Sequence, residues 1–475
     1  MVKHIITLVA IALVLVGKTA TAQLYDYPDD SFKNQHVYHV ALMVPLYLEQ
    51  VTEEFWDEAP NNKMLLTKPF SFLHFYEGFM IAADSMANSR GMKLELKVYD
   101  VDNDVNKAVE AIADPWLANA DMIVGPFYIK PFEKVMKFAS DNDILIVNPI
   151  TQRSNIIDNQ PNVIKVKPSF DSQIDQLEML IRDYYHSNSI FIISKDGVGD
   201  ADMISRINEI AERHMDSLSY VGNREVVKVI KKHQTRWKFL NVEFEEFDYH
   251  TDSRHLDISS LKEAIDDSTA FANRIININY DRDSLKIVSE YASTMRNNLF
   301  VVYGNDKLFA NEIVNKVTKL TEYFPLTVVM MPEWSKFDRL FNENLMKMKA
   351  IYMDDNYIDY QSIRVMSFIK KFRDRYGTEP QAYAYQGFDI CWYFLNALND
   401  YGREFTAHLE GYNIPLLHSE FHFERKNENS GFENRFWNVY QFKGYNKMII
   451  KPLLRQSDSE ETNGYEMKGV FYDER

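Results

Sequence analysis

Short apolar segments alternate with segments of helical period along most of this chain. Residues 36–46 alternate and then become continuously apolar, which predicts a central strand. Residues 70–88 carry apolar side chains at helical spacing, which predicts a helix with one buried face. The same succession predicts strands at 92–101, 122–124, 144–147, 190–194, 242–247, 274–278 and 299–303, and helices at 108–118, 131–140, 173–185, 203–214, 258–265, 282–295 and 309–321. Strands that alternate with helices favour an α/β fold with parallel sheets.

The pattern changes in the last third of the chain. Two further strands are predicted at 326–331 and 348–353, followed by two helices at 361–376 and 384–401. After these helices, residues 420–450 alternate in short runs separated by turn residues. This end of the chain therefore predicts antiparallel strands, at 420–424, 437–442 and 444–450.

The length of the chain predicts two lobes. A chain of 475 residues exceeds the size at which one hydrophobic core keeps growing. Residues 162–169 are interpreted as a segment that crosses from one lobe to the other. The expected organisation is a signal peptide (1–22), lobe 1 (36–165), lobe 2 (166–322), a return to lobe 1 (323–418), C-terminal strands of lobe 2 and the hinge (419–455), and an acidic tail (456–475).

The N-terminus has the features of a secretory signal. Lys3 and His4 precede an apolar run over 5–16, and Ala20-Thr21-Ala22 forms a small-residue cleavage site. The apolar run is too short to serve as a permanent membrane anchor. An uncleaved N-terminal anchor is the alternative. We therefore expect an exported protein with no stable membrane insertion.

The net charge limits the classes of partner, and the cysteine content indicates a buried thiol. The formal net charge of −16 argues against nucleic acid and anionic lipid as partners. The basic residues Lys231, Lys232 and Lys238 form a local exception, either a solvated helix face or a binding patch. The single cysteine, Cys391, lies in an apolar helical pattern and is expected to be buried.

Signatures of catalysis and of metal binding are weak. Asp196-Gly197-Val198-Gly199 follows a predicted strand, but no third glycine completes a dinucleotide-binding motif. Asp100, Asp102 and Asp104 begin like a calcium loop, yet the required glycine and glutamate do not follow. The histidines show no metal-ligand spacing. The sequence therefore predicts no enzyme activity, no metal and no cofactor.

Several local motifs together resemble those of type 1 periplasmic binding proteins, the fold of the branched-chain amino-acid receptors of ABC transporters. They are 75–78 on the first helix, Gly125-Pro126, 148–151, 167–169, 376–380 and 387–389, with the C-terminal hairpin. The resemblance implies two doubly wound parallel-sheet lobes joined by a multi-strand hinge. It also implies a periplasmic, non-catalytic receptor that closes over a small polar ligand (an amino acid, a peptide or a related solute) and serves a membrane permease.

The resemblance also implies ligand-binding residues. Thr151 matches the binding threonine of the family, and the alternative is a threonine that caps the helix starting at Asn155. Glu333 matches the acidic residue that pairs with a ligand ammonium, and the alternative is an ordinary solvated loop glutamate. The predicted ligand-binding set comprises Thr151, Glu333, Tyr128, Asn148, Tyr303 and Asn305.

Some positions depart from the pattern of amino-acid receptors. Phe127, Tyr128 and Ile129 stand where those receptors have small hydroxyl residues, and Arg153 adds a cation. Val198 replaces an aromatic lid residue. These changes suggest a different or larger ligand, or none. The alternative function is an envelope scaffold that binds a protein such as a cell-wall synthase. A cleft filled by Tyr128, Phe127 or Trp334 would favour that alternative.

Overall fold

The computed structural model describes residues 36–51, 70–197, 201–215, 274–280, 283, 285–294, 296–304, 306–331, 334, 342–443 and 446–451. The predicted signal peptide, strand 242–247, helix 258–265 and acidic tail lie outside these residues. Glu333 and Asn305 of the predicted site also lie outside them.

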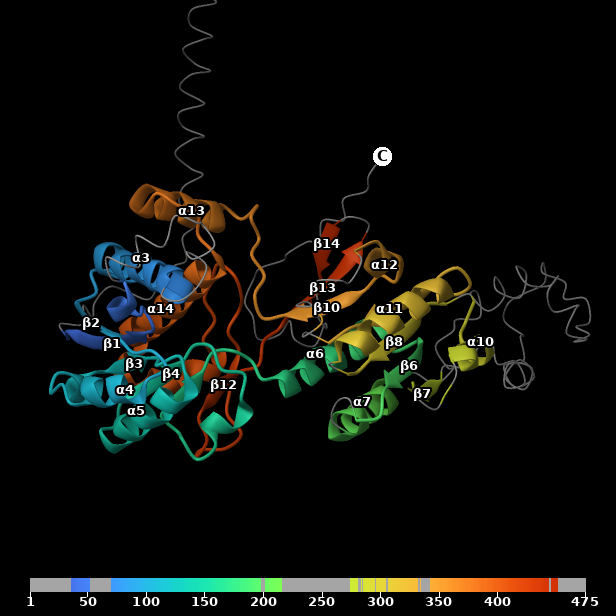
Figure 1. The fold of residues 1–475 in the computed structure, drawn as a ribbon, viewed down its shortest axis with the longest axis horizontal. Coiled ribbons are helices and arrows are strands. Elements are labelled where there is room, and N and C mark those ends of the chain that lie inside the picture. Colours follow the sequence, from blue (N-terminus) through green and yellow to red (C-terminus); the bar gives the residue numbers. More distant parts are fainter. Residues whose placement is uncertain are drawn as a thin grey trace, which may run out of the picture.

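The described residues form two sheets of mostly parallel strands, one in each lobe (Figure 1). The first sheet has the order β11-β12-β5-β4-β3-β1-β2. Its strands are β1 (Tyr38–Val44), β2 (Leu94–Asp100), β3 (Met122–Val124), β4 (Leu145–Asn148), β5 (Val163–Lys165), β11 (Phe423–Glu424) and β12 (Phe432–Asn434). The second has the order β14-β13-β10-β9-β8-β6-β7. Its strands are β6 (Ser189–Ser194), β7 (Ile275–Asn279), β8 (Asn298–Val302), β9 (Leu326–Val329), β10 (Ile351–Asp354), β13 (Asn438–Lys443) and β14 (Asn446–Ile449).

Helices cover both faces of the first sheet. Val40 and Leu42 of β1 pack in the core that holds α3 (Leu73–Arg90) and α14 (Ala382–Tyr401). Ala41 and Met43 point the other way, into the core with α4 (Val105–Ile112) and α5 (Ile129–Asp141). Because successive side chains of a strand alternate between faces, a strand buried on both faces must be apolar throughout. The continuous apolar run in the sequence is explained by this position.

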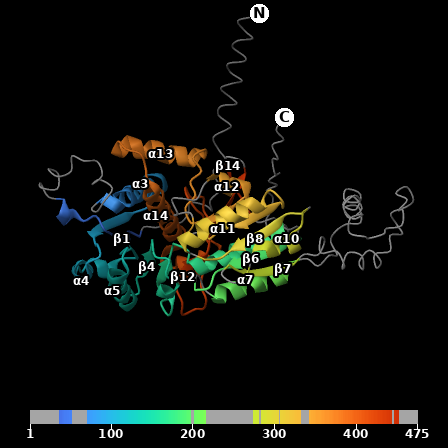
Figure 2. The same cartoon turned by 45° about the vertical axis from the view of Figure 1, so that its right-hand side comes forward.

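Two glycines let α3 and α14 approach closely. A Cβ on Gly78 would lie 1.9 Å from the carbonyl oxygen of Ala384, and one on Gly387 would lie 2.1 Å from that of Phe75. Cys391 lies one turn further along α14 and is fully buried, as predicted. α13 (Ile363–Tyr376) lies on the outer side of these two helices in both ribbon views (Figures 1 and 2).

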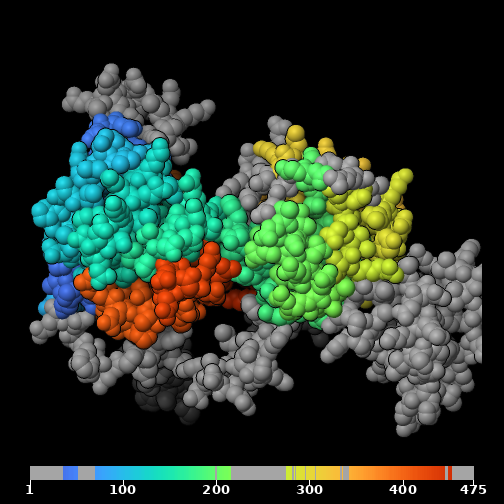
Figure 3. Space-filling view, turned by 90° about the horizontal axis from the view of Figure 1, so that it is seen from below, coloured from blue at the N-terminus to red at the C-terminus, as the bar shows by residue number. Residues whose placement is uncertain are grey.

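The second lobe has its own core. Its helices are α6 (Gln173–Leu180), which continues as a π-helical turn over Ile181–Tyr185, α7 (Ala201–His214), α10 (Val288–Tyr291), α11 (Lys307–Leu320) and α12 (Asn342–Lys347). Trp334 and the strands β6, β8, β9 and β10 supply its buried side chains. Figure 3 shows the two lobes as separate masses that meet at a narrow waist.

The chain crosses between the sheets three times within the described residues, after β5, after β10 and after β12. The expected return to lobe 1 at residue 323 is wrong, because β9 and β10 pair within the second sheet. The chain returns only after β10. Residues 423–434 likewise belong to the first sheet, where β12 pairs with β5, and β13 is the first strand of the C-terminal region in lobe 2. An apolar strand has the same sequence pattern in either sheet, so pairing alone decides these boundaries.

One predicted helix is shorter than expected. In place of the helix over 282–295, the described residues form a 3₁₀ turn (Leu285–Ile287) and a single α turn, α10. Among the described residues, no helix has both the length and the apolar character needed to cross a bilayer.

Candidate functional site

Asn148 and Thr151 lie in one turn at the carboxyl end of β4. The Asn148 Oδ1 accepts hydrogen bonds from the backbone N–H groups of Ile150 at 3.3 Å and Thr151 at 2.9 Å. The Thr151 Oγ1 accepts one from the N–H of Arg153 at 3.3 Å. Gln386 of α14 donates to the carbonyl of Pro149 at 2.9 Å, which ties the turn to the helix. The turn is therefore built by its own side chains and anchored from outside.

The side-chain nitrogen of Asn148 has no hydrogen-bond acceptor. Asn148 is fully buried, and its Nδ2 has no hydrogen-bond partner. A buried donor without an acceptor costs about 1–3 kcal/mol. Thr151 does not cap the following 3₁₀ turn, which runs over Ser154–Ile157 and has Arg153 as its N-cap. The alternative role of Thr151 as a helix cap is therefore wrong.

Tyr128 is held by a second tyrosine. Its hydroxyl lies 2.7 Å from the hydroxyl of Tyr47, whose backbone is left-handed at φ 54°. Three successive N–H groups, those of Leu46, Tyr47 and Leu48, donate to the carboxylate of Asp100 at 2.8 to 3.0 Å. Burial, and then the bond to Tyr128, raises the pKa of Tyr47, so this hydroxyl stays neutral. Asp100 thus shapes the strand-end turn that presents Tyr47, a role the sequence analysis missed.

Two of the three side chains considered as plugs of the cleft are buried inside separate lobes. Phe127 packs edge-on against Phe72 and Phe75 in the core of lobe 1. Trp334 is fully buried in lobe 2, where its Nε1 donates to the carbonyl of Gly304 at 2.7 Å. Neither ring fills the space between the lobes.

Tyr303 lies in the other lobe from Tyr128, Asn148 and Thr151. It follows β8, is 8% exposed, and its N–H donates to the carbonyl of Ile193 at 2.9 Å. It lines a cavity of about 20 Å³ with mostly apolar walls, which has room for a water molecule and not for a solute. The structure therefore brings Asn148 and Thr151 together, and it does not place Tyr303 beside them.

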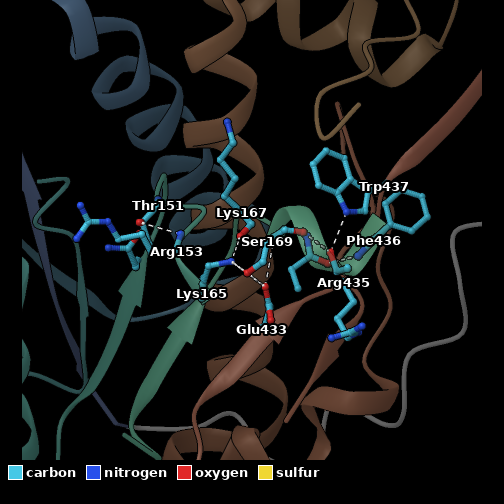
Figure 4. A network of polar contacts seen from close by, with 12 residues as sticks. Thr151, Arg153, Lys165, Lys167, Ser169, Glu433, Arg435, Phe436 and Trp437 are labelled. Atoms are coloured by element: carbon cyan, nitrogen blue, oxygen red, sulfur yellow. Dashed lines mark hydrogen bonds and ion pairs between the residues drawn. The ribbon is translucent and has the colours of Figure 1, made fainter. Parts of the chain in front are cut away.

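The hinge carries a buried ion pair (Figure 4). Lys165 of β5 donates from its Nζ to Glu433 Oε1 at 2.8 Å, Ser169 Oγ at 2.8 Å and the carbonyl of Lys167 at 2.6 Å. The N–H of Ser169 also donates to Glu433 Oε1 at 2.8 Å. Burial alone would raise the pKa of Glu433, but the charge of Lys165 and the bonds from Lys165 and Ser169 outweigh it and hold that pKa below its ordinary value.

Further polar contacts fasten the crossing segments. Arg435 of the third crossing pairs with Asp175 of α6 at 2.6 Å. Trp437 donates from its Nε1 to Ser172 Oγ at 2.8 Å. Lys167 of the first crossing pairs with Asp355 of the second at 3.0 Å. The hinge is thus a cross-linked assembly rather than three independent strands. The one indication of this hinge in the sequence is Lys165, a charged residue within the apolar run of β5.

The hinge does not have the exposure that a catalytic site needs. Ser169 and Lys165 are arranged like a serine nucleophile with a lysine base. However, both side chains are buried, at 1% and 0% exposure, so a substrate carbonyl does not reach them. Among the described residues, no group of three or more histidine, cysteine or acidic side chains is placed to hold a metal ion.

Comparisons with known proteins bear on the fold. No protein-family model matches the chain, and no curated protein matches it in sequence. A solved structure from Rhodospirillum rubrum, described as a branched-chain amino acid ABC transporter, is similar at 10% identity with a TM-score of 0.53, and covers 87% of this chain and 100% of that one. A substrate-binding protein of Desulfitobacterium hafniense in complex with Leu has 11% identity and a TM-score of 0.43, with coverage of 87% and 100%.

These identities establish fold alone. This chain and the R. rubrum structure share an overall fold, with a TM-score of 0.53 over 87% of this chain. The doubly wound two-lobe architecture expected from the sequence is therefore confirmed. This chain has the fold of the type 1 periplasmic binding proteins.

Proposed function

We propose that this chain is an exported, periplasmic solute-binding protein that closes its two lobes over a small polar ligand without catalysis. The observation that carries the proposal is the unmatched, buried Nδ2 of Asn148 beside Thr151 at a strand end of lobe 1. In open α/β sheets, ligands bind outside the carboxyl ends of strands. A ligand carboxylate or carbonyl at this turn would accept the free hydrogen bond of Asn148.

The aromatic side chains of lobe 1 suggest the rest of the site. Tyr128 is partly buried, and Tyr383 at the start of α14 is 37% exposed and packs on Phe72 at 4.9 Å. Such a wall suits the apolar part of an amino acid, a short peptide or a related solute. We assign Glu333 to a ligand ammonium and Asn305 to a further contact, and we leave out Tyr303 because it is buried beside a cavity too small for a solute. A membrane permease is the partner that this function requires.

A thermal-melt screen of the chain from Gln23 onward tests the proposal. The panel comprises amino acids, short peptides and cell-wall fragments. A ligand at about one hundred times its dissociation constant stabilises the folded state by about 2.7 kcal/mol, which raises the melting temperature measurably. We expect a hit that Thr151→Ala and Glu333→Ala abolish. Thr318→Ala is the matched control, because its hydroxyl bonds only the carbonyl of Val314 on α11.

A second candidate function is a scaffold that binds a protein of the envelope. The observation that favours it is a strip of exposed apolar side chains at the start of α13: Tyr360 is 62% exposed, Ile363 82% and Met366 49%. A panel without any hit, together with capture of a cell-wall synthase that Ile363→Asp abolishes, would favour the scaffold and contradict the receptor.

A further inference from the structure

A second cavity, of about 650 Å³, lies beside β7, the edge strand of the second sheet. We call it the lysine groove. Among the described residues, its lining comes from Tyr280 after β7, from the 3₁₀ turn and α10, and from the C-terminal half of α11. It belongs to lobe 2 alone, so it is separate from the turn that holds Asn148 and Thr151. Small-molecule pockets have volumes of roughly 300–1,000 Å³, and the groove falls within that range.

The groove lies beside a segment that is less helical than expected. The sequence predicts a helix over 282–295. The described residues instead form the 3₁₀ turn at Leu285–Ile287 and the single turn of α10. Lys316, Lys319 and Leu320 of α11 line the groove beside this segment.

The floor of the groove is apolar. Phe324 is 9% exposed, and Leu285 and Leu320 lie beside it in the lining. Tyr280 packs edge-on against the buried Phe309, with 5.4 Å between ring centroids. The N–H of Tyr280 donates to the carbonyl of Ser194 at 2.7 Å, which ties this residue to the neighbouring strand β6. The floor can therefore bury an apolar group.

The rim of the groove is basic. Lys316 and Lys319 lie one turn apart on α11, and Lys286 of the 3₁₀ turn also lines the groove. The Nζ of Lys316 lies 4.4 Å from the ring centroid of Tyr280 and donates to its hydroxyl. Among the described residues of the lining, the one carboxylate is that of Asp283, which accepts the N–H of Asn279 at 2.8 Å. Outside the lining, Glu312 accepts the Tyr280 hydroxyl at 2.7 Å.

This local charge runs against that of the whole molecule, since the chain has a net charge of −16. A concave site with one sign of charge concentrates ions of the opposite sign. The ammonium group of lysine binds compact oxyanions as a point charge and does not require the planar geometry that arginine selects. We propose that the lysine groove binds an organic anion, a carboxylate or a phosphate ester, that carries an apolar body. This site is independent of the cleft function proposed above.

Calorimetric titration of the chain from Gln23 onward tests the proposal. The probes are octanoate and octyl phosphate, with acetate and octyltrimethylammonium as controls. We expect both octyl anions to bind with a dissociation constant near or below 1 mM, acetate to bind at least tenfold more weakly because it lacks the apolar body, and the octyl cation not to bind. The double variant Lys316→Gln/Lys319→Gln should weaken binding of both octyl anions at least tenfold.

The matched control is Lys370→Gln/Lys371→Gln, which removes the same charge from the exposed face of α13. It should change the dissociation constant less than twofold. Ser289→Trp, placed in the lining, should block the groove without altering its lysines. Equal binding of the octyl cation, an unaffected α11 double variant, or no binding of either anion would overturn the proposal. Loss of octanoate binding in Thr151→Ala would also overturn it, because the anion would then occupy the cleft.

Discussion

Lys165 and Glu433 form a buried ion pair between residues 268 positions apart in the chain, with 2.8 Å between Lys165 Nζ and Glu433 Oε1. They stand directly opposite each other on the parallel strands β5 and β12. Both residues immediately precede a crossing between the lobes. The pair therefore fastens two of the three crossings at their root in lobe 1.

Removing one partner of this pair should destabilise the protein strongly. Lys165→Met leaves the carboxylate of Glu433 buried without its cation, which costs about 3–5 kcal/mol. The double variant Lys165→Met/Glu433→Leu should recover most of that loss, because no buried charge remains. Equilibrium denaturation in urea measures both values. A double variant that is less stable than the single one would contradict the expectation.

The close contact of α3 and α14 predicts an unusual response to alanine. Gly→Ala inside a helix normally adds about 1 kcal/mol of stability. Gly387→Ala should instead lower the free energy of unfolding by roughly 1–3 kcal/mol, since its Cβ would meet the carbonyl oxygen of Phe75. Gly411→Ala is the control, because nothing lies within 4 Å of the added Cβ. Stabilisation by Gly387→Ala in thermal melts would show that the helices are not in contact there.

Glu77 predicts a pH dependence of stability. Burial raises the pKa of Glu77 to about 7, and its Oε2 has no hydrogen-bond partner. A carboxyl whose folded pKa exceeds its unfolded value binds more protons in the folded state. Its contribution to stability is therefore fully present below about pH 4.5 and is lost as the pH rises towards 7.

The variant Glu77→Gln tests this pH dependence. Glu77→Gln should remove this loss of stability, so the variant should be more stable than the parent chain at pH 8. The expected gain is on the order of 1 kcal/mol, because part of the Glu77 side chain reaches solvent. Glu133→Gln on α5 is the control, as Glu133 is exposed. Denaturation curves at pH 5 and pH 8 give the comparison. If the variant and the parent chain lose the same free energy of unfolding between pH 5 and pH 8, the raised pKa is not that of Glu77.

The ion pair of Lys167 with Asp355 predicts an effect on lobe motion rather than on stability. Both side chains are partly exposed, at 24% and 22%, so Lys167→Gln should cost less than about 1 kcal/mol. The pair joins two crossings, and its loss should broaden the distribution of distances between the lobes.

Fluorescent labels at Glu133→Cys on α5 and Glu209→Cys on α7 would report this distance, and the fully buried Cys391 would not compete for label. Lys370→Gln serves as the control. An unchanged distribution in Lys167→Gln would mean that the remaining hinge contacts alone set the distance between the lobes.

The sequence by itself determined the α/β succession of this protein and most of its elements. Hydrophobic period is a local property, so the strand at Tyr38–Val44 and the helices at Leu73–Arg90 and Ala382–Tyr401 could be recognised from their own residues. The same local signals placed Asn148 and Thr151 in one turn. They also predicted that Cys391 is buried.

Tertiary structure alone decided which sheet each strand joins. β9 and β10 carry the apolar pattern of any buried strand, and only their pairing with β8 and with each other places them in lobe 2. The partners of Lys165 and Asp100 are likewise set by contacts between residues far apart in the chain. Such contacts produce no periodic pattern in the sequence. The lysine groove follows the same rule, since Tyr280, Ser289 and Lys316 are apart in the chain and all line it.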